Sequence, residues 1–92
     1  MNLFAGIGKI VDVNLNGRVL KFNLAILQEK PCCVSCLLFD PTDEVKDFIE
    51  QTKATEQIVW LQGRLASTEF DSKGRTIRKM DVITYAKSIK TI

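Results

Sequence analysis

The sequence predicts a single all-β domain whose strands are interrupted by one helix. Three observations support this prediction. Apolar and polar residues alternate with a period of two over residues 18–27 and again over residues 57–70, which is typical of half-buried strands. Apolar residues at Val45, Phe48 and Ile49 have the spacing of an amphipathic helix whose apolar stripe joins the core. The length, 92 residues, suffices for one domain and is too short for two.

The composition excludes several functional classes. Hydrophobic residues make up 46% and charged residues 26%, as in an ordinary soluble folded domain. The longest apolar stretch, Cys32–Phe39, is far shorter than the ~18 residues of a membrane span, and Met1–Ile7 lacks the cationic start of a signal peptide. With 0 histidines, the chain cannot form a Ser-His-Asp or Cys-His catalytic site, or a zinc site that needs imidazole. We therefore expect no enzyme activity, no cofactor and no metal.

The first two strands are predicted at residues 3–13 and 18–27. Between them, Asn14–Gly17 forms the turn, because Asn-Gly is the strongest short hairpin signal. Gly6 and Gly8 fit a bent strand or the close approach of a neighbouring backbone. A Gly-x-Gly alone is a weak indication of a phosphate loop, and no Gly-Lys follows at the required spacing.

The cysteines are clustered at the start of the predicted third strand, residues 32–39. Cys33 and Cys36 have the spacing of a metal or redox pair, but on a strand they would point to opposite faces. They also supply only two ligands, with no histidine to complete a site. The simpler interpretation is that the cysteines, Cys32 included, are small apolar residues of a buried strand. Thiols without partners favour a reducing, intracellular compartment.

The helix is predicted directly after the third strand. Asp40 can cap it and Pro41 suits its first position. Asp43 and Glu44 in the first turn favour the positive end of the helix dipole. Further carboxylates along the helix alternate with lysines, which indicates a solvated face rather than a catalytic or metal-binding cluster.

The fourth and fifth strands are predicted at residues 57–70 and 75–89, joined by a turn at 71–74. One face of the fourth strand is apolar, while the other includes Trp60 and Arg64, an unusual mixture for a plain solvent face. The irregular alternation of the fifth strand predicts a β-bulge. Three strands, a helix and two strands form the five-stranded OB-fold barrel with one helix between strands 3 and 4. This fold binds oligonucleotides or oligosaccharides through strands 2 and 3 and the neighbouring loops.

Charge is unevenly distributed, although the net charge is only +2. Residues 28–59 carry three cations and seven anions, whereas residues 60–92 carry seven cations and three anions. Such a distribution can give a small domain one basic face. Scatter over a solvated surface accounts for the charges equally well.

Several short motifs, in this order and spacing, resemble the OB domain of the bacterial-type single-stranded DNA-binding protein family over nearly the whole chain. Ile7–Ile10 resembles the family's first-strand motif, and Asn16–Ala25 its Asn/Ser-Gly turn and second strand. Val34–Phe39 resembles its third strand, which ends in a base-stacking aromatic residue. Ile58–Leu65 is similar to its fourth strand, and Asp71–Arg78 to its basic hairpin.

The resemblance implies non-catalytic binding of single-stranded DNA in replication, repair or recombination by a homodimer or homotetramer. It also implies a location in the cytoplasm, at the nucleoid, or in an organelle of bacterial origin. Such proteins stack bases on aromatic side chains and hold phosphates with cations. The candidate nucleic-acid-binding residues are Phe39, Phe70, Lys9, Lys21, Arg64, Lys73, Arg75, Arg78 and Lys79.

The sequence departs from the family pattern at several places. Cys33 stands where the family often has an aromatic residue early in the third strand, and Lys30 or nearby polar residues where another aromatic follows the second strand. The first loop is short, and the acidic tail of full-length members does not follow Ile92, as expected of a short form. A primosomal-replication-protein-N-like member is a close variant. The alternative is an OB-fold protein-interaction module with little nucleic-acid affinity. The sequence leaves the role of Trp60 open.

Overall fold

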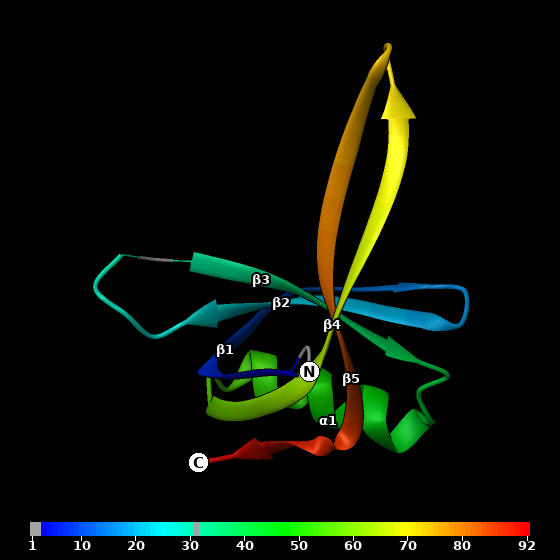
Figure 1. The fold of residues 1–92 in the computed structure, drawn as a ribbon. Helices are drawn as coiled ribbons and strands as arrows, with labels where there is room; N and C mark the ends of the chain where they lie inside the picture. The colour runs from blue at the N-terminus through cyan, green and yellow to red at the C-terminus, as the bar shows by residue number, and fades with distance from the viewer. Residues whose placement is uncertain (1–2, 31) are drawn as a thin grey trace.

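The structure, a computed structural model, describes residues 3–30 and 32–92; the side chains of Thr68 and Phe70 lie outside that description. Five strands and one helix follow one another along the chain (Figure 1). Their bounds are β1 (Leu3–Asn16), β2 (Val19–Ile26), β3 (Cys32–Phe39), α1 (Asp43–Ala54), β4 (Ile58–Ser72) and β5 (Arg75–Thr91).

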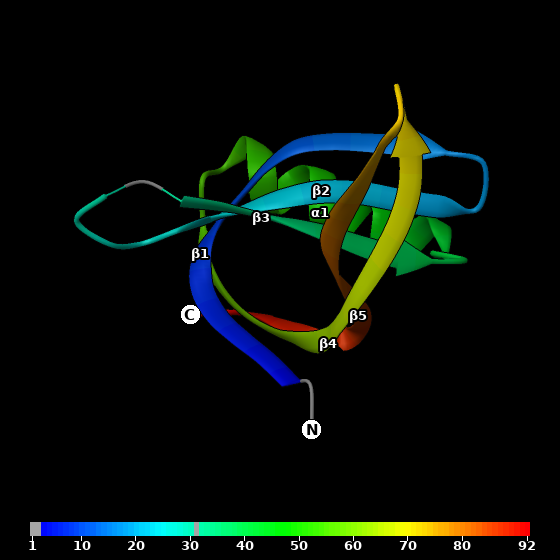
Figure 2. The same cartoon turned by 45° about the horizontal axis from the view of Figure 1, so that its top comes forward.

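The strands close into a barrel in the order β1-β2-β3-β5-β4 (Figure 2). Neighbouring strands are antiparallel except β3 and β5, which are parallel where Cys36 pairs with Val82. The helix α1 lies across one end of the barrel (Figure 1). The predicted five-stranded OB-fold barrel with one helix between strands 3 and 4 is therefore confirmed.

The barrel interior is filled by the inward-facing residues that the period-two pattern predicts. Phe22 is the largest of them and is only 2% exposed. Ile49 contributes from α1 and closes the end of the barrel that the helix covers. The buried hydrophobic residues are Ile10, Leu20, Phe22, Leu24, Cys36, Leu38, Ile49, Val59, Leu61, Val82 and Ile89.

The buried side of α1 differs from the predicted stripe. Ile49 and Thr52 are buried, whereas Phe48 is 36% exposed and borders a hollow beside Thr91. Thr52 can be buried because its hydroxyl donates a hydrogen bond of 2.6 Å to the carbonyl of Phe48. The prediction that Phe48 is a core residue is wrong, because the helix contacts the barrel end along a narrower strip of its surface.

The helix also begins later than predicted. The Thr42 hydroxyl accepts a hydrogen bond of 3.3 Å from the Val45 N–H, so Thr42 is the N-cap and Asp43 begins the helix. Asp40 is in a left-handed conformation with φ of 48°, and it turns the chain away from β3. Asp40 is therefore not the cap and Pro41 is not the first helical residue.

Both predicted hairpin turns are tighter than expected. β1 continues to Asn16, which pairs with Val19, and β4 continues to Ser72, which pairs with Arg75. The second turn consists of Lys73 and Gly74, with φ of 52° and 76°. Positive φ at both central residues is the requirement of a type I′ turn, whose twist matches that of the flanking strands.

Two irregularities shape the barrel. In β5, Thr84 pairs with Gly63 and Ile89 pairs with Leu61, so residues 85–88 lie opposite Gln62. This register shift confirms the irregularity predicted for the fifth strand. In β1 the register shifts between Val11 and Asn14, and Asp12 in that bulge has φ of 55°. Sequence alternation gave no indication of the β1 bulge.

β1 and β2 approach each other closely at Gly8. A Cβ on Gly8 would overlap the carbonyl group of Ala25, the residue before its ladder partner Ile26. The close backbone approach predicted for this glycine is therefore confirmed. It lets β1 bend around the barrel while pairing with both β2 and β4.

The β4–β5 hairpin extends beyond the barrel as a two-stranded arm (Figure 1). We call residues 66–81 the arm; its ladder runs from the Ala66–Asp81 pair to the Ser72–Arg75 pair. The arm rises beside the outer face of β2 and β3 (Figure 2). It therefore adds a wall to one side of that face.

Candidate nucleic-acid interface

The outer face of β1, β2 and β3 carries small and polar side chains. Strand pairing places Lys9, Ala25 and Cys33 in one row across the three strands. Asn23 and Ser35 are paired in the next row. Because these side chains project little from the sheet, a flat ligand can approach the backbone closely.

A groove of about 390 Å³ lies on this face, where β2 meets the bulge of β1 and the base of the arm. Polar side chains dominate its lining, and lysines from β2 and β5 contribute to it. The lining residues are Asp12, Asn14, Lys21, Phe22, Asn23, Ser35 and Lys79. This is the strand 2–3 face that OB-folds use for oligonucleotides or oligosaccharides.

Three of the candidate cations lie on this side of the barrel. Lys21 and Lys79 line the groove itself. Lys9 lies farther along the same face, in the row that contains Cys33. The structure therefore brings Lys21 and Lys79 together from strands far apart in the sequence and leaves Lys9 outside the groove, in the row next to Asn23 and Ser35.

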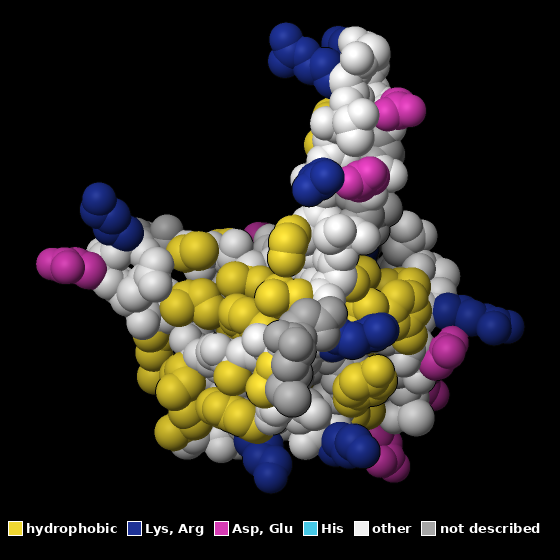
Figure 3. Space-filling view, viewed as in Figure 1, with side chains coloured by type: hydrophobic (Ala, Val, Ile, Leu, Met, Phe, Trp, Pro, Cys, Tyr) yellow, Lys and Arg dark blue, Asp and Glu magenta, His cyan; other side chains and the backbone are white. Residues whose placement is uncertain are grey.

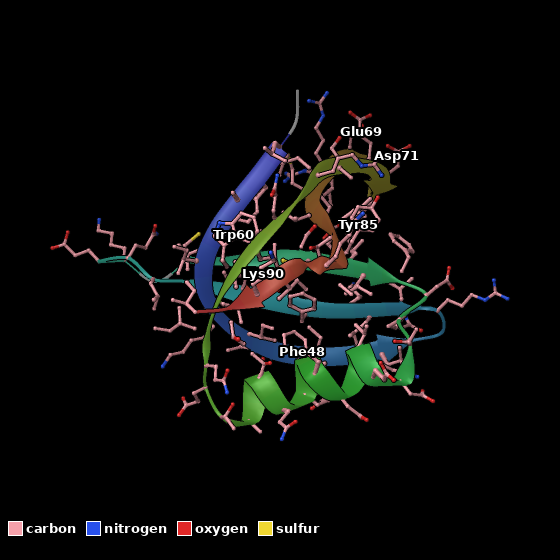
Figure 4. All side chains as sticks on the ribbon, turned by 90° about the horizontal axis from the view of Figure 1, so that it is seen from below. Phe48, Trp60, Glu69, Asp71, Tyr85 and Lys90 are labelled. Carbon is pink, nitrogen blue, oxygen red and sulfur yellow. The ribbon has the colours of Figure 1, made fainter. Side chains whose placement is uncertain are left out.

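The arm has two chemically different sides. Residues paired across an antiparallel ladder share a side, and successive residues alternate. Arg78 pairs with Glu69, and its Nε lies 2.7 Å from the Glu69 Oε1 (Figure 4 labels Glu69). On the same side, the Thr76 hydroxyl donates a hydrogen bond of 3.2 Å to Asp71. Lys79, next to Arg78 in the strand, is on the opposite side, which borders the groove.

The remaining candidate cations lie outside the groove. Lys73 and Arg75 are exposed at the tip of the arm, where Figure 3 shows basic side chains. Arg64 lines a different hollow, of about 250 Å³, together with Leu3 and Tyr85. The structure therefore does not bring Arg64 or the arm-tip cations to the groove of Lys21 and Lys79.

Phe39 is the aromatic candidate that the structure places on the outer face. It ends β3 opposite Val19 and is 49% exposed. It has the same strand parity as Ser35, as the sequence predicted. The backbone of Phe70 pairs with Ile77 in the arm, but its side chain lies outside the described residues. Its assignment as a stacking residue therefore stays a prediction.

The cysteines have two different environments. Cys36 is fully buried in the core, as predicted for a small apolar residue, whereas Cys32 and Cys33 are exposed. The predicted burial of all three is thus wrong for the first two, because β3 begins beyond the edge of the core. Cys33 and Cys36 are on opposite faces, as predicted. Among the described residues, no group of three or more His, Cys, Asp or Glu could hold a metal ion.

We expect Cys36 to resist thiol reagents that modify Cys32 and Cys33. Burial raises the pKa of Cys36 to about 12, so folding favours the protonated thiol. Its contribution to stability is complete below the unfolded pKa of about 9.0 and is lost as the pH rises toward 12. Timed reaction with a chromogenic disulfide at pH 8, in buffer and in denaturant, measures this difference. Equal rates for all three thiols in the native protein would contradict it.

Sequence reasoning missed part of the groove. Asp12, Asn14 and Asn23 line it, but none was a candidate binding residue. The alternation of residues 18–27 already placed Asn23 on the outer face, so that residue could have been found. Asp12 lies in the β1 bulge, which has no local sequence signal, and Asn14 is the first paired residue after it.

Comparison with solved structures matches the whole chain to single-stranded DNA-binding proteins. The Plasmodium falciparum SSB in complex with ssDNA has a TM-score of 0.68 and 20% identity, covering 100% of this chain and 93% of the other. The mitochondrial single-stranded DNA-binding protein Rim1 of S. cerevisiae has a TM-score of 0.75 and 14% identity, covering 99% and 94%. A second structure of Rim1 in the same form has a TM-score of 0.71 and 15% identity, covering 98% and 93%.

The chain has the fold of single-stranded DNA-binding proteins. At these identities the likeness establishes the fold alone. No family model matches the sequence, and no curated protein matches it either. The helix of the described chain is too short and too polar to cross a membrane.

Proposed function

We propose that this protein binds single-stranded DNA without catalysing a reaction on it. The observation that carries the proposal is the groove on the β2–β3 face, whose lining includes Lys21 and Lys79. Cations along a groove track phosphates, and an exposed aromatic such as Phe39 offers a surface for base stacking. The structural neighbours support the proposal because they are named as single-stranded DNA-binding proteins.

The proposed contacts divide into three groups. Lys9, Lys21 and Lys79 hold phosphates along the β1–β3 face, while Phe39 and Phe70 stack bases. Lys73 and Arg75 extend the basic path along the arm. Arg78 and Arg64 contribute least, because Glu69 neutralises the first and the second lies in another hollow.

The wider role follows the sequence resemblance. We propose descent from the bacterial-type single-stranded DNA-binding protein family, with primosomal-replication-protein-N-like members as the close variant. The corresponding roles are replication, repair or recombination. The corresponding location is the cytoplasm, in association with the nucleoid, or an organelle of bacterial origin.

Titration of fluorescent oligo-dT tests the proposed function directly. Each phosphate neutralised on a single strand contributes about −0.7 to the slope of log affinity against log salt. We therefore expect the affinity for oligo-dT to fall steeply as the salt concentration rises. The affinity should depend little on the base at most positions of the DNA strand, and duplex DNA of the same length should bind more weakly. Tight binding that ignores salt, or a preference for duplex, would contradict the proposal.

An OB-fold protein-interaction module is the second candidate function. Cys33 and Lys30 are both exposed, and they stand at or near positions where the family that the sequence resembles often has aromatic residues, which lowers the number of stacking surfaces. The same titration discriminates the two candidates. Failure to bind oligo-dT at low salt would favour the interaction module.

We also propose that the protein forms a homodimer or homotetramer through the outer face of β1 and β4. Ile7 on β1 pairs with Trp60 on β4, and Ile7 is 44% exposed. Leu3 and Tyr85 are 54% exposed and border the neighbouring hollow. Hydrophobic side chains spread over the face of the barrel that Figure 3 shows below the arm. Because exposed apolar surface of this kind marks interfaces, a second copy is the proposed occupant.

Ile7→Lys is expected to shift this assembly to monomers. Sedimentation at tens of micromolar should show a species heavier than 10.4 kDa for the original chain and a 10.4 kDa monomer for the variant. Ile77→Lys is the matched control, because Ile77 is 41% exposed but lies on the arm. A monomeric original chain, or dissociation by the control alone, would contradict the proposed interface.

A further inference from the structure

The groove contains a carboxylate, which is unexpected in a site that binds phosphates. Asp12 is exposed and lines the groove together with Lys21 and Lys79. Among the described residues Asp12 forms no ion pair, so its charge is not neutralised by either lysine. A phosphate placed beside it would be repelled.

The backbone is arranged to hold this carboxylate in place. Asp12 is in the β1 bulge with φ of 55°, a left-handed conformation that non-glycine residues rarely adopt. Bulges re-aim side chains and are common beside functional sites. Across the ladder, the Asn23 Nδ2 donates a hydrogen bond of 3.1 Å to the Asp12 Oδ2. The carboxylate therefore has a fixed position, with the lone pairs of Oδ1 and one of Oδ2 still available.

The groove around Asp12 suits a nucleobase better than a phosphate. Asn14, Asn23 and Ser35 supply neutral hydrogen-bonding groups, and the volume of about 390 Å³ is open to the outer face. Lys21 and Lys79 in the lining attract the backbone of the strand. Repulsion from Asp12 keeps phosphates away from its part of the groove, so a base rather than a phosphate is favoured beside it.

We propose that Asp12 accepts hydrogen bonds from an unstacked guanine and gives the site a guanine preference at one position. This inference rests on the proposed function. An ionised carboxylate can only accept hydrogen bonds. Guanine presents two adjacent donors on its Watson–Crick edge, N1–H and the N2 amino group, which match the two carboxylate oxygens. Thymine places its single N3–H between two carbonyl oxygens, which the carboxylate repels. Adenine and cytosine each offer one amino donor beside an acceptor nitrogen.

The experiment compares oligo-dT of about 12 nucleotides, within the range of one OB fold, with strands that carry one central guanine, inosine, adenine or cytosine. One guanine per strand prevents quadruplex formation. A good bidentate base contact discriminates by roughly 5–150-fold, and partial exposure of this groove places the expected guanine preference near the lower end, at about fivefold. Inosine, which lacks the N2 amino group, should fall between guanine and thymine.

Asp12→Asn removes the charge while keeping the shape and the tolerance for a left-handed backbone. We expect it to reduce the guanine preference to about one and to raise oligo-dT affinity by about twofold, because a repulsive charge is lost. Asp12→Gly, which suits the positive φ of the bulge, provides the same test if the asparagine variant folds poorly. Asp47→Asn is the control for the loss of one negative charge, because Asp47 is exposed on α1. It should leave the guanine preference and the oligo-dT affinity unchanged.

Each outcome has a distinct meaning. Equal affinity of the original chain for all strands would overturn the guanine contact while leaving single-strand binding intact. A preference that survives in both Asp12 variants would show that another residue reads the base. If Asp12 only stabilises the bulge, its variants would have a changed thermal midpoint but an unchanged ratio of affinities for the guanine and thymine strands, and the guanine contact would be overturned. Failure of every strand to bind would overturn the proposed function itself.

Discussion

Replacing Phe22 by alanine is expected to lower the free energy of unfolding by about 3–5 kcal/mol, whereas Phe39→Ala should leave stability nearly unchanged. Phe22 is 2% exposed at the centre of the barrel, and Phe39 is 49% exposed on the outer face. Small domains are stable by only about 5–15 kcal/mol, so the loss at Phe22 is a large fraction of the total. Thermal and urea unfolding of the two variants measure the difference.

In DNA binding, Phe39→Ala should cause the larger loss of affinity and Phe22→Ala the smaller one. Base stacking on an aromatic side chain is worth about 1–3 kcal/mol per base. We therefore expect Phe39→Ala to weaken oligo-dT binding about tenfold or more, since 1.4 kcal/mol is one decade of affinity. Phe70→Ala should behave similarly if Phe70 is a stacking residue. Affinity per folded molecule should fall much less for Phe22→Ala, because Phe22 lines the groove but is only 2% exposed.

Phe48→Ala provides an intermediate case. Phe48 is 36% exposed, so its removal should cost less stability than removal of Phe22 and should not affect affinity. If Phe39→Ala or Phe70→Ala unfolds the protein while affinity per folded molecule persists, that residue belongs to the core. Its assignment to the binding face would then be wrong.

The double variant Lys21→Ala and Lys79→Ala is expected to weaken oligo-dT binding by at least tenfold at low salt. Both lysines line the groove and neither is in an ion pair among the described residues. Loss of two phosphate contacts should reduce the salt slope by about 1.4, at about 0.7 for each contact on a single strand. Titrations of oligo-dT at several salt concentrations give both values.

Arg78→Ala is the matched control for this variant. Arg78 and Lys79 are neighbours in β5, but Arg78 forms an ion pair of 2.7 Å with Glu69 on the other side of the arm. Its removal should change affinity by less than about twofold and leave the salt slope nearly unaltered, because the charge is already compensated. If Arg78→Ala weakens binding as much as the double variant does, the strand does not follow the groove side of the arm.

The sequence alone determined the architecture. Alternation of apolar residues over 18–27 and 57–70 depends only on the period of a strand, so it predicted which residues fill the barrel. The place of the helix in the element order predicted the OB-fold. The outward parity of Ser35 and Phe39 was predicted for the same reason, and so was the irregularity of β5. These properties are local, because each follows from residues within a few positions of one another.

The tertiary structure decided which surface residues meet. Lys21 and Lys79 are far apart in the sequence, and they share a groove because the parallel pairing of β3 with β5 sets the arm beside β2. Phe48 was misjudged because the strip by which α1 contacts the barrel depends on distant partners. The ion pair of Arg78 with Glu69 likewise depends on pairing across the arm, and the role of Arg78 in binding stays a prediction. Asp12 was missed for a related reason. The bulge interrupts the β1–β2 ladder between Val11 and Asn14, and the hydrogen bond to Asp12 comes from Asn23 on the neighbouring strand, so neither can be read from the residues beside Asp12 in the sequence.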